Sequence, residues 1–389
     1  MANHLPEIAR LFFRLGWTAF GGPAAHTAMM EDEIVERRKW MDRQHFLDLM
    51  GATNLIPGPN STELALHCGL HRGGWKGLVV AGLCFLFPAI LLTGTLAWLY
   101  VEYGTLPEIA PFFVGIKPAV LALILGAVYK LGKKALKGWE LGVIGASVVV
   151  VALLGVNEIL AILGGGFVGM IWLLLMRGGK GKSAMWSWMP LWLTSGLSSG
   201  LNLQTRVPVE LLAVSMPNPG GIFLMFLKIG AILFGSGYVL VAYLEGDFVG
   251  SGLLTQQELL DAVAMGQFTP GPVLSTATFV GFQLDGIAGA AAATAGIFLP
   301  SFVFVLLLNP LVPRLRKSPW ASAFLDAVNI SAVGIMVAVL YSLGEGSLID
   351  WRSWVIAGLS CAVYFGLKKV SSLWIVLGGA LLGYLLYLI

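Results

Sequence analysis

The chain has 389 residues, of which 57% are hydrophobic and only 12% are charged, and its mean hydropathy is +0.83. No soluble globular domain needs such a ratio, so the composition predicts an integral membrane protein with several helical spans. The formal net charge is only +3. The three cysteines lie apart inside apolar stretches, which supports neither a disulfide framework nor a zinc site. We expect no metal, no cofactor and no nucleic-acid partner.

The first half of the chain predicts one helix, a broken hairpin and four apolar spans. We expect no cleavable signal peptide before the helix, because the first ten residues have no compact apolar core. The hairpin is interrupted by "NLIPGPNST", residues 54–62. Two prolines around a glycine cannot continue a helix, and each arm of the hairpin is too short to cross a bilayer. The helix, the hairpin and the four spans are predicted at about 8–30, 45–71, 77–100, 109–130, 139–156 and 158–176.

The second half predicts the same order of elements. Between the halves, "MWSWMPLWL" at 185–193 is rich in tryptophan and is expected to lie at the membrane interface without spanning it. The helix, the hairpin and the four spans then recur at about 221–244, 257–283, 286–309, 322–344, 351–367 and 371–388. The sequence therefore predicts an all-α polytopic membrane protein, with about five transmembrane helices and one re-entrant broken hairpin in each half.

Three collinear blocks indicate that the two halves repeat one another. "LGWTAFGG" (15–22) aligns with "IGAILFGS" (229–236), and "FLDLMGATNLIPGPNSTE" (46–63) aligns with "LLDAVAMGQFTPGPVLST" (259–276). A third block aligns further along the chain, and chance does not readily produce three blocks in the same order. We call two residues that align in this way repeat mates. The predicted domains are a first repeat at 1–180, a linker at 181–214 and a second, inverted repeat at 215–389.

The distribution of basic residues predicts that the repeats cross the membrane in opposite directions. The loop after the first helix holds Arg37, Arg38, Lys39 and Arg43, while its counterpart at 245–258 has no lysine or arginine, and the later loop pairs show the same opposition. Basic residues favour the cytoplasmic side. This is the inverted-repeat plan of secondary transporters, in which the substrate site lies near the midplane at the repeat interface. A parallel duplication with accidental charge bias is the alternative.

The repeated Pro-Gly-Pro break predicts the substrate pathway. Inside a bilayer, irregular backbone occurs only where it is buried in protein or lines a polar cavity. A helix begins after each break, and its free N–H groups, its positive dipole end and its first-turn hydroxyls suit an anion. A break that merely turns a short hairpin is the alternative. The residues predicted to bind the substrate are Gly21, Gly22, Pro57, Gly58, Pro59, Asn60, Ser61 and Thr62 in the first repeat and Gly271, Ser275 and Thr276 in the second.

Cations inside apolar helices add to this site. Arg14 and Lys228 are repeat mates within the first helix of each half. A charge in such a helix is expensive unless it is paired or functional, so both are predicted anion ligands. The alternative is that Arg14 snorkels to the surface or pairs with a structural acid. Lys117, in a third span, is a further candidate ligand, and pairing with an acid such as Asp326 is its alternative.

Four side chains are candidates for proton coupling or charge balance: Glu31, Glu63, Glu245 and His26. Glu31 and Glu245 are repeat mates, and Glu63 lies four residues after Pro59, where it is expected to face the same pocket. A carboxylate near an anion site neutralises a spare cation, or it carries a proton whose loading alternates with substrate. His26 titrates near neutral pH if it is free, although a lone histidine is more often simply hydrogen-bonded.

The segment "FGGPAAHTAMMEDEIVERRKWMDRQHFLDLMGATNLIPGPNSTELALHCGLHRGGWKGLVVAGLCFLFPA" (20–89) resembles the signature region of the chromate ion transporter family. "FGSGYVLVAYLEGDFV" and "FTPGPVLSTATFVGF" resemble the second domain of that family, so the resemblance covers essentially the whole chain in the long, two-domain form. It implies chromate efflux across the bacterial inner membrane, energised by the proton gradient or the membrane potential, with chromate resistance as the outcome.

The resemblance also implies functional weight for the matching Arg14, Glu31, Asn54 and 57–61. The second copy departs from the first, because Val273 stands where the first repeat has Asn60 and a Ser-Gly pair replaces a Gly-Pro pair. The two half-sites are therefore expected to be unequal.

The substrate chemistry agrees with the resemblance. Chromate is a tetrahedral dianion, so cations, backbone N–H groups and hydroxyls suit it, and the nearly isosteric sulfate is not distinguished. An enzyme is not expected, because no GxSxG, HExxH or clustered metal-ligand motif occurs. A passive anion channel is the nearer alternative, because it would use the same helix ends and cations. The expected partners are chromate and the lipid bilayer, with sulfate and a homodimer left open.

Overall fold

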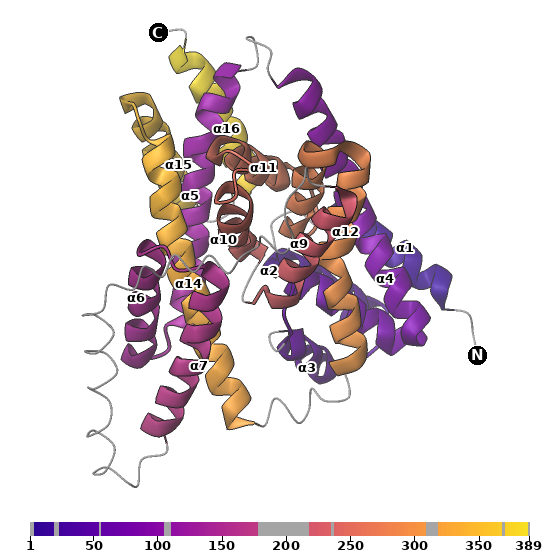
Figure 1. The fold of residues 1–389 in the computed structure, drawn as a ribbon. Helices are drawn as coiled ribbons and strands as arrows, with labels where there is room; N and C mark the ends of the chain where they lie inside the picture. Colours follow the sequence, from indigo (N-terminus) through magenta and orange to yellow (C-terminus); the bar gives the residue numbers. More distant parts are fainter. Residues whose placement is uncertain are drawn as a thin grey trace.

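A computed structural model gives the fold (Figure 1), and it describes residues 4–18, 23–53, 56–104, 110–177, 218–234, 237–308, 318–367 and 370–387. Every regular element within these ranges is helical, which confirms the predicted all-α class. The first half contains α1 (Leu5–Thr18), α2 (Pro23–Glu31), the π-helical turn η1 (Asp32–Arg37), α3 (Arg43–Thr53), α4 (Asn60–Tyr103), α5 (Ala110–Ala135), α6 (Trp139–Leu153) and α7 (Glu158–Arg177). The second half contains α9 (Pro219–Ile232), η3 (Gly237–Val239), α10 (Leu240–Leu244), η4 (Glu245–Val249), α11 (Gln256–Phe268), η5 (Val273–Ser275), α12 (Thr276–Leu308), α14 (Pro319–Ser347), α15 (Trp351–Gly366) and α16 (Ser372–Tyr387).

The chain is a multi-pass membrane protein. Five of the described helices, α4, α5, α7, α12 and α14, are long and apolar enough to cross a bilayer, and α6, α9 and α16 are shorter apolar helices. Large apolar side chains such as Phe87, Trp98 and Leu307 are about half exposed on the outer surface. A surface of this kind is stable against lipid tails, whereas in water it would promote association. The Trp-rich segment at 185–193 lies outside the described residues.

The first predicted helix of each half is broken, which corrects the expectation of one continuous helix at about 8–30 and at about 221–244. In the first half α1 ends at Thr18 and α2 begins at Pro23, whose ring fits the first turn of a helix but not its interior. In the second half α9 ends at Ile232, and Leu233 after it is extended (ψ 95°). Both breaks fall at matching places in the two repeats.

The long helix α4 consists of two helices that form a tight antiparallel hairpin. Gly73 and Gly74 depart from helical geometry, and Gly74 has a φ of 61°, which favours glycine. Gly69 then lies directly against Gly77, eight residues away, which a straight helix would hold well apart. In α12 the same turn occurs at Asp285 and Gly286. The described residues therefore contain the predicted broken hairpin in both halves: a helix, a break, a second short helix and a sharp return.

Helices of each half pack against helices of the other half. In Figure 1, α5 of the first half runs beside α15 and α16 of the second, and α14 of the second half packs on α6 and α7 of the first. α4 and α12 also pack on one another, each with its own first helix, α1 or α9, beside it. Small residues permit this close packing, since the α5 backbone at Gly115 touches Gly379 and Gly383 of α16. The interface between the halves is thus continuous across the molecule, and the breaks lie on it.

Candidate functional site

Both Pro-Gly-Pro breaks depend on a glycine with a left-handed backbone. Gly58 has a φ of 139° and Gly271 has a φ of 98°, values that other residues adopt only with strain. The prolines that follow, Pro59 and Pro272, are extended and stand immediately before a helical turn. The chain therefore stops one helix, turns at the glycine and starts the next helix within a few residues.

Each break rests against the long helix of the opposite half. Gly58 touches Ser301 of α12, next to Pro300, and Gly271 touches Ala89 of α4, next to Pro88. Ala89 and Ser301 are repeat mates, so the two contacts correspond. The sequence predicted substrate binding at the repeat interface, and the structure brings both breaks to that interface.

Further contacts tie the breaks across the interface. The Gly58 amide donates to the Leu233 carbonyl, at the broken end of α9, with an N···O distance of 2.7 Å. The Thr93 hydroxyl of α4 donates to the Thr269 hydroxyl beside the second break at 3.4 Å. A movement of one half against the other must therefore change the surroundings of both breaks.

The first turn of α4 is polar and buried, and several polar groups at it lack a hydrogen-bond partner among the described residues. Ser61, Thr62 and Glu63 are 0–2% exposed, and the Thr62 and Glu63 amides both donate to the Pro59 carbonyl. Among the described residues, no hydrogen bond of normal geometry reaches the Thr62 hydroxyl, either Glu63 oxygen or the Ser301 hydroxyl. Buried polar groups normally have partners, so a cluster of unpaired ones beside a helix start makes this turn the candidate ligand site.

The corresponding turn of the second repeat is satisfied by its own hydroxyls. Ser275 lies 3.4 Å from Thr269, and the Thr276 hydroxyl donates to the Val273 carbonyl at 2.8 Å. A three-residue 3₁₀ turn at 273–275 also precedes α12 there, whereas α4 starts at once after Pro59. The two helix starts therefore differ in polarity, because the unpaired hydroxyls and carboxylate lie at the first, whereas near the second break the unpaired group among the described residues is the Gln267 amide nitrogen.

The two matched cations each hold a matched acid. Arg14 lies 2.5 Å from Glu33, and Lys228 lies 2.8 Å from Asp247, where Glu33 and Asp247 are repeat mates. Burial alone would raise the pKa of Glu33, but the hydrogen bond and charge of Arg14, assisted by Arg38 and Arg37, lower it. The pairing with a structural acid that the sequence left open for Arg14 is thus what the structure contains, and an anion-ligand role for either cation stays a prediction.

Lys117 faces an acid of the second repeat. Its ammonium group interacts electrostatically with Asp261 of α11, whose carboxylate also accepts a hydrogen bond from the Tyr100 hydroxyl at 2.9 Å. Asp326, which the sequence considered as its partner, binds Lys137 at 2.6 Å. The Lys117–Asp261 pair lies where α5 packs on α11, again between the repeats.

The remaining predicted site residues do not come together at the breaks in the described part of the chain. Glu31 pairs with Arg43 at 3.0 Å, and Glu245 accepts a hydrogen bond from Ser342 at 2.5 Å. His26 is buried with its ring edge on Phe85. Gly21, Gly22 and Asn54 lie outside the described residues. Of the four candidates for proton coupling, only Glu63 lies against a break.

Sequence reasoning missed Ser301 and the network around Glu7. Aligning the halves at their repeated prolines would have placed Ser301 opposite Ala89 and marked it as a polar substitution. Glu7 binds Arg38 and Arg72 and accepts a hydrogen bond from the Trp40 indole, so it joins the ends of α1, η1 and the α4 hairpin. No sequence spacing brings these residues together.

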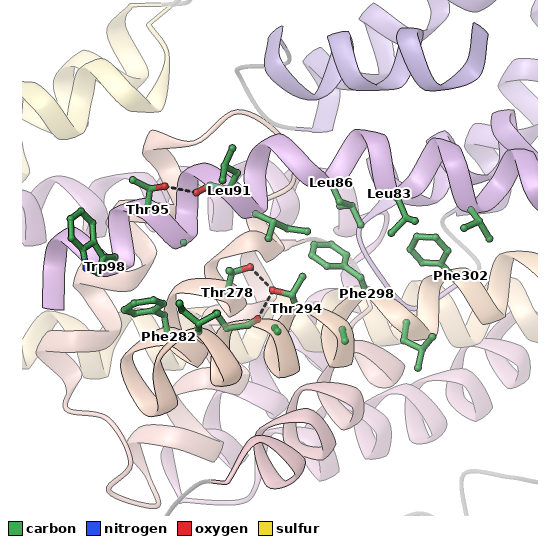
Figure 2. Close-up of a pocket in the computed structure, with 18 residues that line it drawn as sticks. Leu83, Leu86, Leu91, Thr95, Trp98, Thr278, Phe282, Thr294, Phe298 and Phe302 are labelled. Atoms are coloured by element: carbon green, nitrogen blue, oxygen red, sulfur yellow. Dashed lines mark hydrogen bonds between the residues drawn. The ribbon is translucent and has the colours of Figure 1, made fainter. Parts of the chain in front are cut away.

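A wide groove between α4 and α12 is too apolar for an oxyanion. It encloses about 840 Å³ and is lined by side chains such as Leu83, Phe282 and Phe298 (Figure 2). Its hydroxyls include Thr278 and Thr294, which bond to one another at 2.8 Å. A dianion needs donors that this groove does not offer, so the breaks remain the candidate site.

Both halves of the chain match one known protein family. The sequence model of a family described as "Chromate transporter" matches residues 6–170 and again residues 220–384. The chain belongs to the chromate transporter family. The two matched segments are of equal length and correspond to the two aligned halves.

Curated relatives agree with this membership. A chromate transport protein of Cupriavidus metallidurans is 31% identical over 98% of this chain and 93% of its own length. One from Pseudomonas aeruginosa is 30% identical over 98% of this chain and 92% of its own length. An uncharacterised transporter of Bacillus subtilis is 30% identical over only 37% of this chain, yet over 75% of its own length, so one half here corresponds to most of that protein. No solved structure matches the chain.

Proposed function

We propose that this protein is a secondary active transporter that moves chromate outward across the bacterial inner membrane and so confers chromate resistance. The observation that carries the proposal is the pair of helix breaks at the interface between the halves, one of which leaves the buried hydroxyls of Thr62 and the facing Ser301 without a partner among the described residues. The substrate class is supported by membership of the family and by the names of two relatives that match over nearly their full length.

The proposed site is the start of α4 together with the facing residue of α12. The backbone N–H group at Ser61 and the hydroxyls of Thr62 and Ser301 supply donors to a tetrahedral oxyanion. In this structure Arg14 holds Glu33 and Lys117 interacts with Asp261, and we infer that each exchanges its acid for the anion when the anion binds. The second break, with its satisfied hydroxyls, contributes shape and packing more than ligands.

Transport by alternating access follows if the two repeats have inverted topology, because the same site then faces each side of the membrane in turn. The exchanged partners α5 and α14 support a rocking of one group of helices against another, since each repeat contributes to both groups. A passive channel would use the same ligands without such a movement.

The test is transport by purified protein in sealed vesicles. Labelled chromate and labelled sulfate are offered separately, with and without an imposed pH gradient or membrane potential. Accumulation of chromate above its equilibrium level, only when a gradient is present, is expected of a coupled transporter. Equilibration that never exceeds the applied electrochemical gradient of chromate itself identifies a channel, and a preference for sulfate reassigns the substrate.

A further inference from the structure

Glu63 is the one acidic side chain that touches a break in the described part of the chain. It is 0% exposed, and its Oε1 atom lies against Gly58, because a helical side chain leans toward the start of its helix. Neither of its oxygens has a hydrogen bond of normal geometry among the described residues. The carboxyl group therefore occupies the same few ångströms as the first turn of α4, which is the proposed anion site.

Within the described residues, no cation compensates the Glu63 carboxyl group. Burial and the neighbouring Ser301 hydroxyl are what act on it within the described residues. Titratable groups also occur on the elements that pack around it, but none of them is among the groups that act on Glu63 in this part of the structure: Arg14 on α1, His26 on α2, Asp48 on α3, His67 one turn further along α4, Asp261 on α11 and Asp285 on α12.

A negative Glu63 and a bound oxyanion exclude one another. Like charges a few ångströms apart in a buried site repel strongly, because the low local dielectric screens them poorly. A protonated Glu63 removes that repulsion and adds an O–H donor, which the anion or Ser301 can accept. Anion binding and protonation of Glu63 therefore favour one another, and by linkage each must raise the affinity for the other.

We propose that Glu63 binds one proton together with each oxyanion, so that the proton and the anion occupy the repeat interface at the same time and move as one load. This inference rests on the proposed function. The repeat mate of Glu63 is Thr276, whose hydroxyl does not gain or lose a proton near neutral pH, so the geometry assigns a single transported proton to the pair of breaks. A dianion and a proton together carry one net negative charge, so transport is electrogenic and the proton travels with the anion and not against it.

The test is proton uptake on binding by the purified full-length protein. Chromate is added in weakly buffered, alkaline solution with a pH-sensitive dye, where free chromate is wholly the dianion and releases or takes up no proton itself. Binding is measured in parallel by equilibrium dialysis. We expect about one proton taken up per chromate bound, and an affinity that falls about tenfold per pH unit once the free protein has lost the Glu63 proton.

Two variants separate Glu63 from other groups. In Glu63→Gln the neutral amide imitates the loaded acid, so we expect chromate to bind at every pH without proton uptake. Glu102→Gln removes an exposed carboxylate near the far end of the same helix and is expected to keep the proton uptake of the wild type.

The outcomes distinguish this inference from the proposed function. Wild-type protein that binds no chromate contradicts the proposed function itself. Wild-type protein that binds chromate without taking up protons contradicts only the role of Glu63, as does undiminished proton uptake in Glu63→Gln, or a monodisperse Glu63→Gln protein that fails to bind. If Glu63→Gln does not fold, the proton uptake and pH dependence of the wild type decide the question.

Discussion

The two glycines at the breaks permit a matched test of the proposed site. Gly58→Ala and Gly271→Ala each force a residue with a β-carbon into a left-handed conformation, which costs about 1–3 kcal/mol. They differ in what the new methyl group meets. At Gly58 it collides with the Glu63 carboxylate and the Ser301 hydroxyl, whereas at Gly271 the one described contact is with the Ala89 methyl group, at 2.9 Å.

The difference between the two variants reports on the polar cluster. Both are expected to insert into the membrane and to lose some thermal stability for the shared backbone reason. Gly58→Ala must also displace Glu63 or Ser301 from the start of α4, so its chromate affinity is expected to fall at least about tenfold below that of Gly271→Ala, or about 1.4 kcal/mol. Equilibrium dialysis of chromate against purified variants measures this ratio, and thermal unfolding in the same detergent measures stability.

A second substitution makes the collision itself testable. Ser301→Ala removes one of the two colliding atoms. Alanine already occurs at the matching position of α4, because Ala89 is the repeat mate of Ser301. In the Gly58→Ala background, Ser301→Ala is expected to restore part of the lost stability, which is a coupling between neighbours and not an additive effect. Equal chromate affinities for Gly58→Ala and Gly271→Ala, in well-folded protein, would refute the location of the site at the first break.

Three further predictions concern topology, acid stability and charge. In a cysteine-free background, single cysteines at the exposed positions Asp42 and Gln257 are expected to react with an impermeant reagent from opposite sides of the membrane; labelling of both from one side contradicts the inverted repeats. The ion pair with Arg14 holds the pKa of Glu33 below its ordinary value of 4.5, so the stability that the pair contributes is complete above pH 4.5 and is lost as the pH falls through the folded pKa. The thermal unfolding temperature of Glu33→Gln is therefore expected to vary less with pH in this acidic range than that of the wild type. A pH profile that is the same for both proteins would show that the pair does not contribute to acid stability. Lys117→Met is expected to weaken chromate binding roughly tenfold to hundredfold, the worth of one charge-assisted contact, while Lys117→Arg retains most of it; wild-type affinity in Lys117→Met excludes Lys117 as a ligand.

Much of the fold is decided by local chemistry that the sequence displays. Hydropathy and length are enough to identify apolar helices, because a spanning helix satisfies its own backbone and needs only an apolar exterior. The break at Pro57–Pro59 is equally local, since proline lacks an amide hydrogen and Gly58 takes a φ of 139°. The repeat is visible because residues with such special backbone roles recur in the same order. The continuous first helix was predicted wrongly where Pro23 begins a new helix, which the pattern of apolar residues hides.

The partners of buried groups were decided only by the tertiary structure. The sequence marked Arg14 and Lys228 as unusual charges, but the acids that neutralise them are brought in by the turns η1 and η4, whose direction depends on the preceding breaks. Ser301 is some 240 residues from Glu63 in the chain, and only the crossing of α12 over α4 places both beside Gly58. Helix periodicity describes which face of a helix is apolar, whereas a contact between two helices depends on how both are packed. The chemistry of the breaks could therefore be predicted from the sequence. The position of Glu63 at the repeat interface, with no cation beside it among the described residues, arises from the packing of one half against the other.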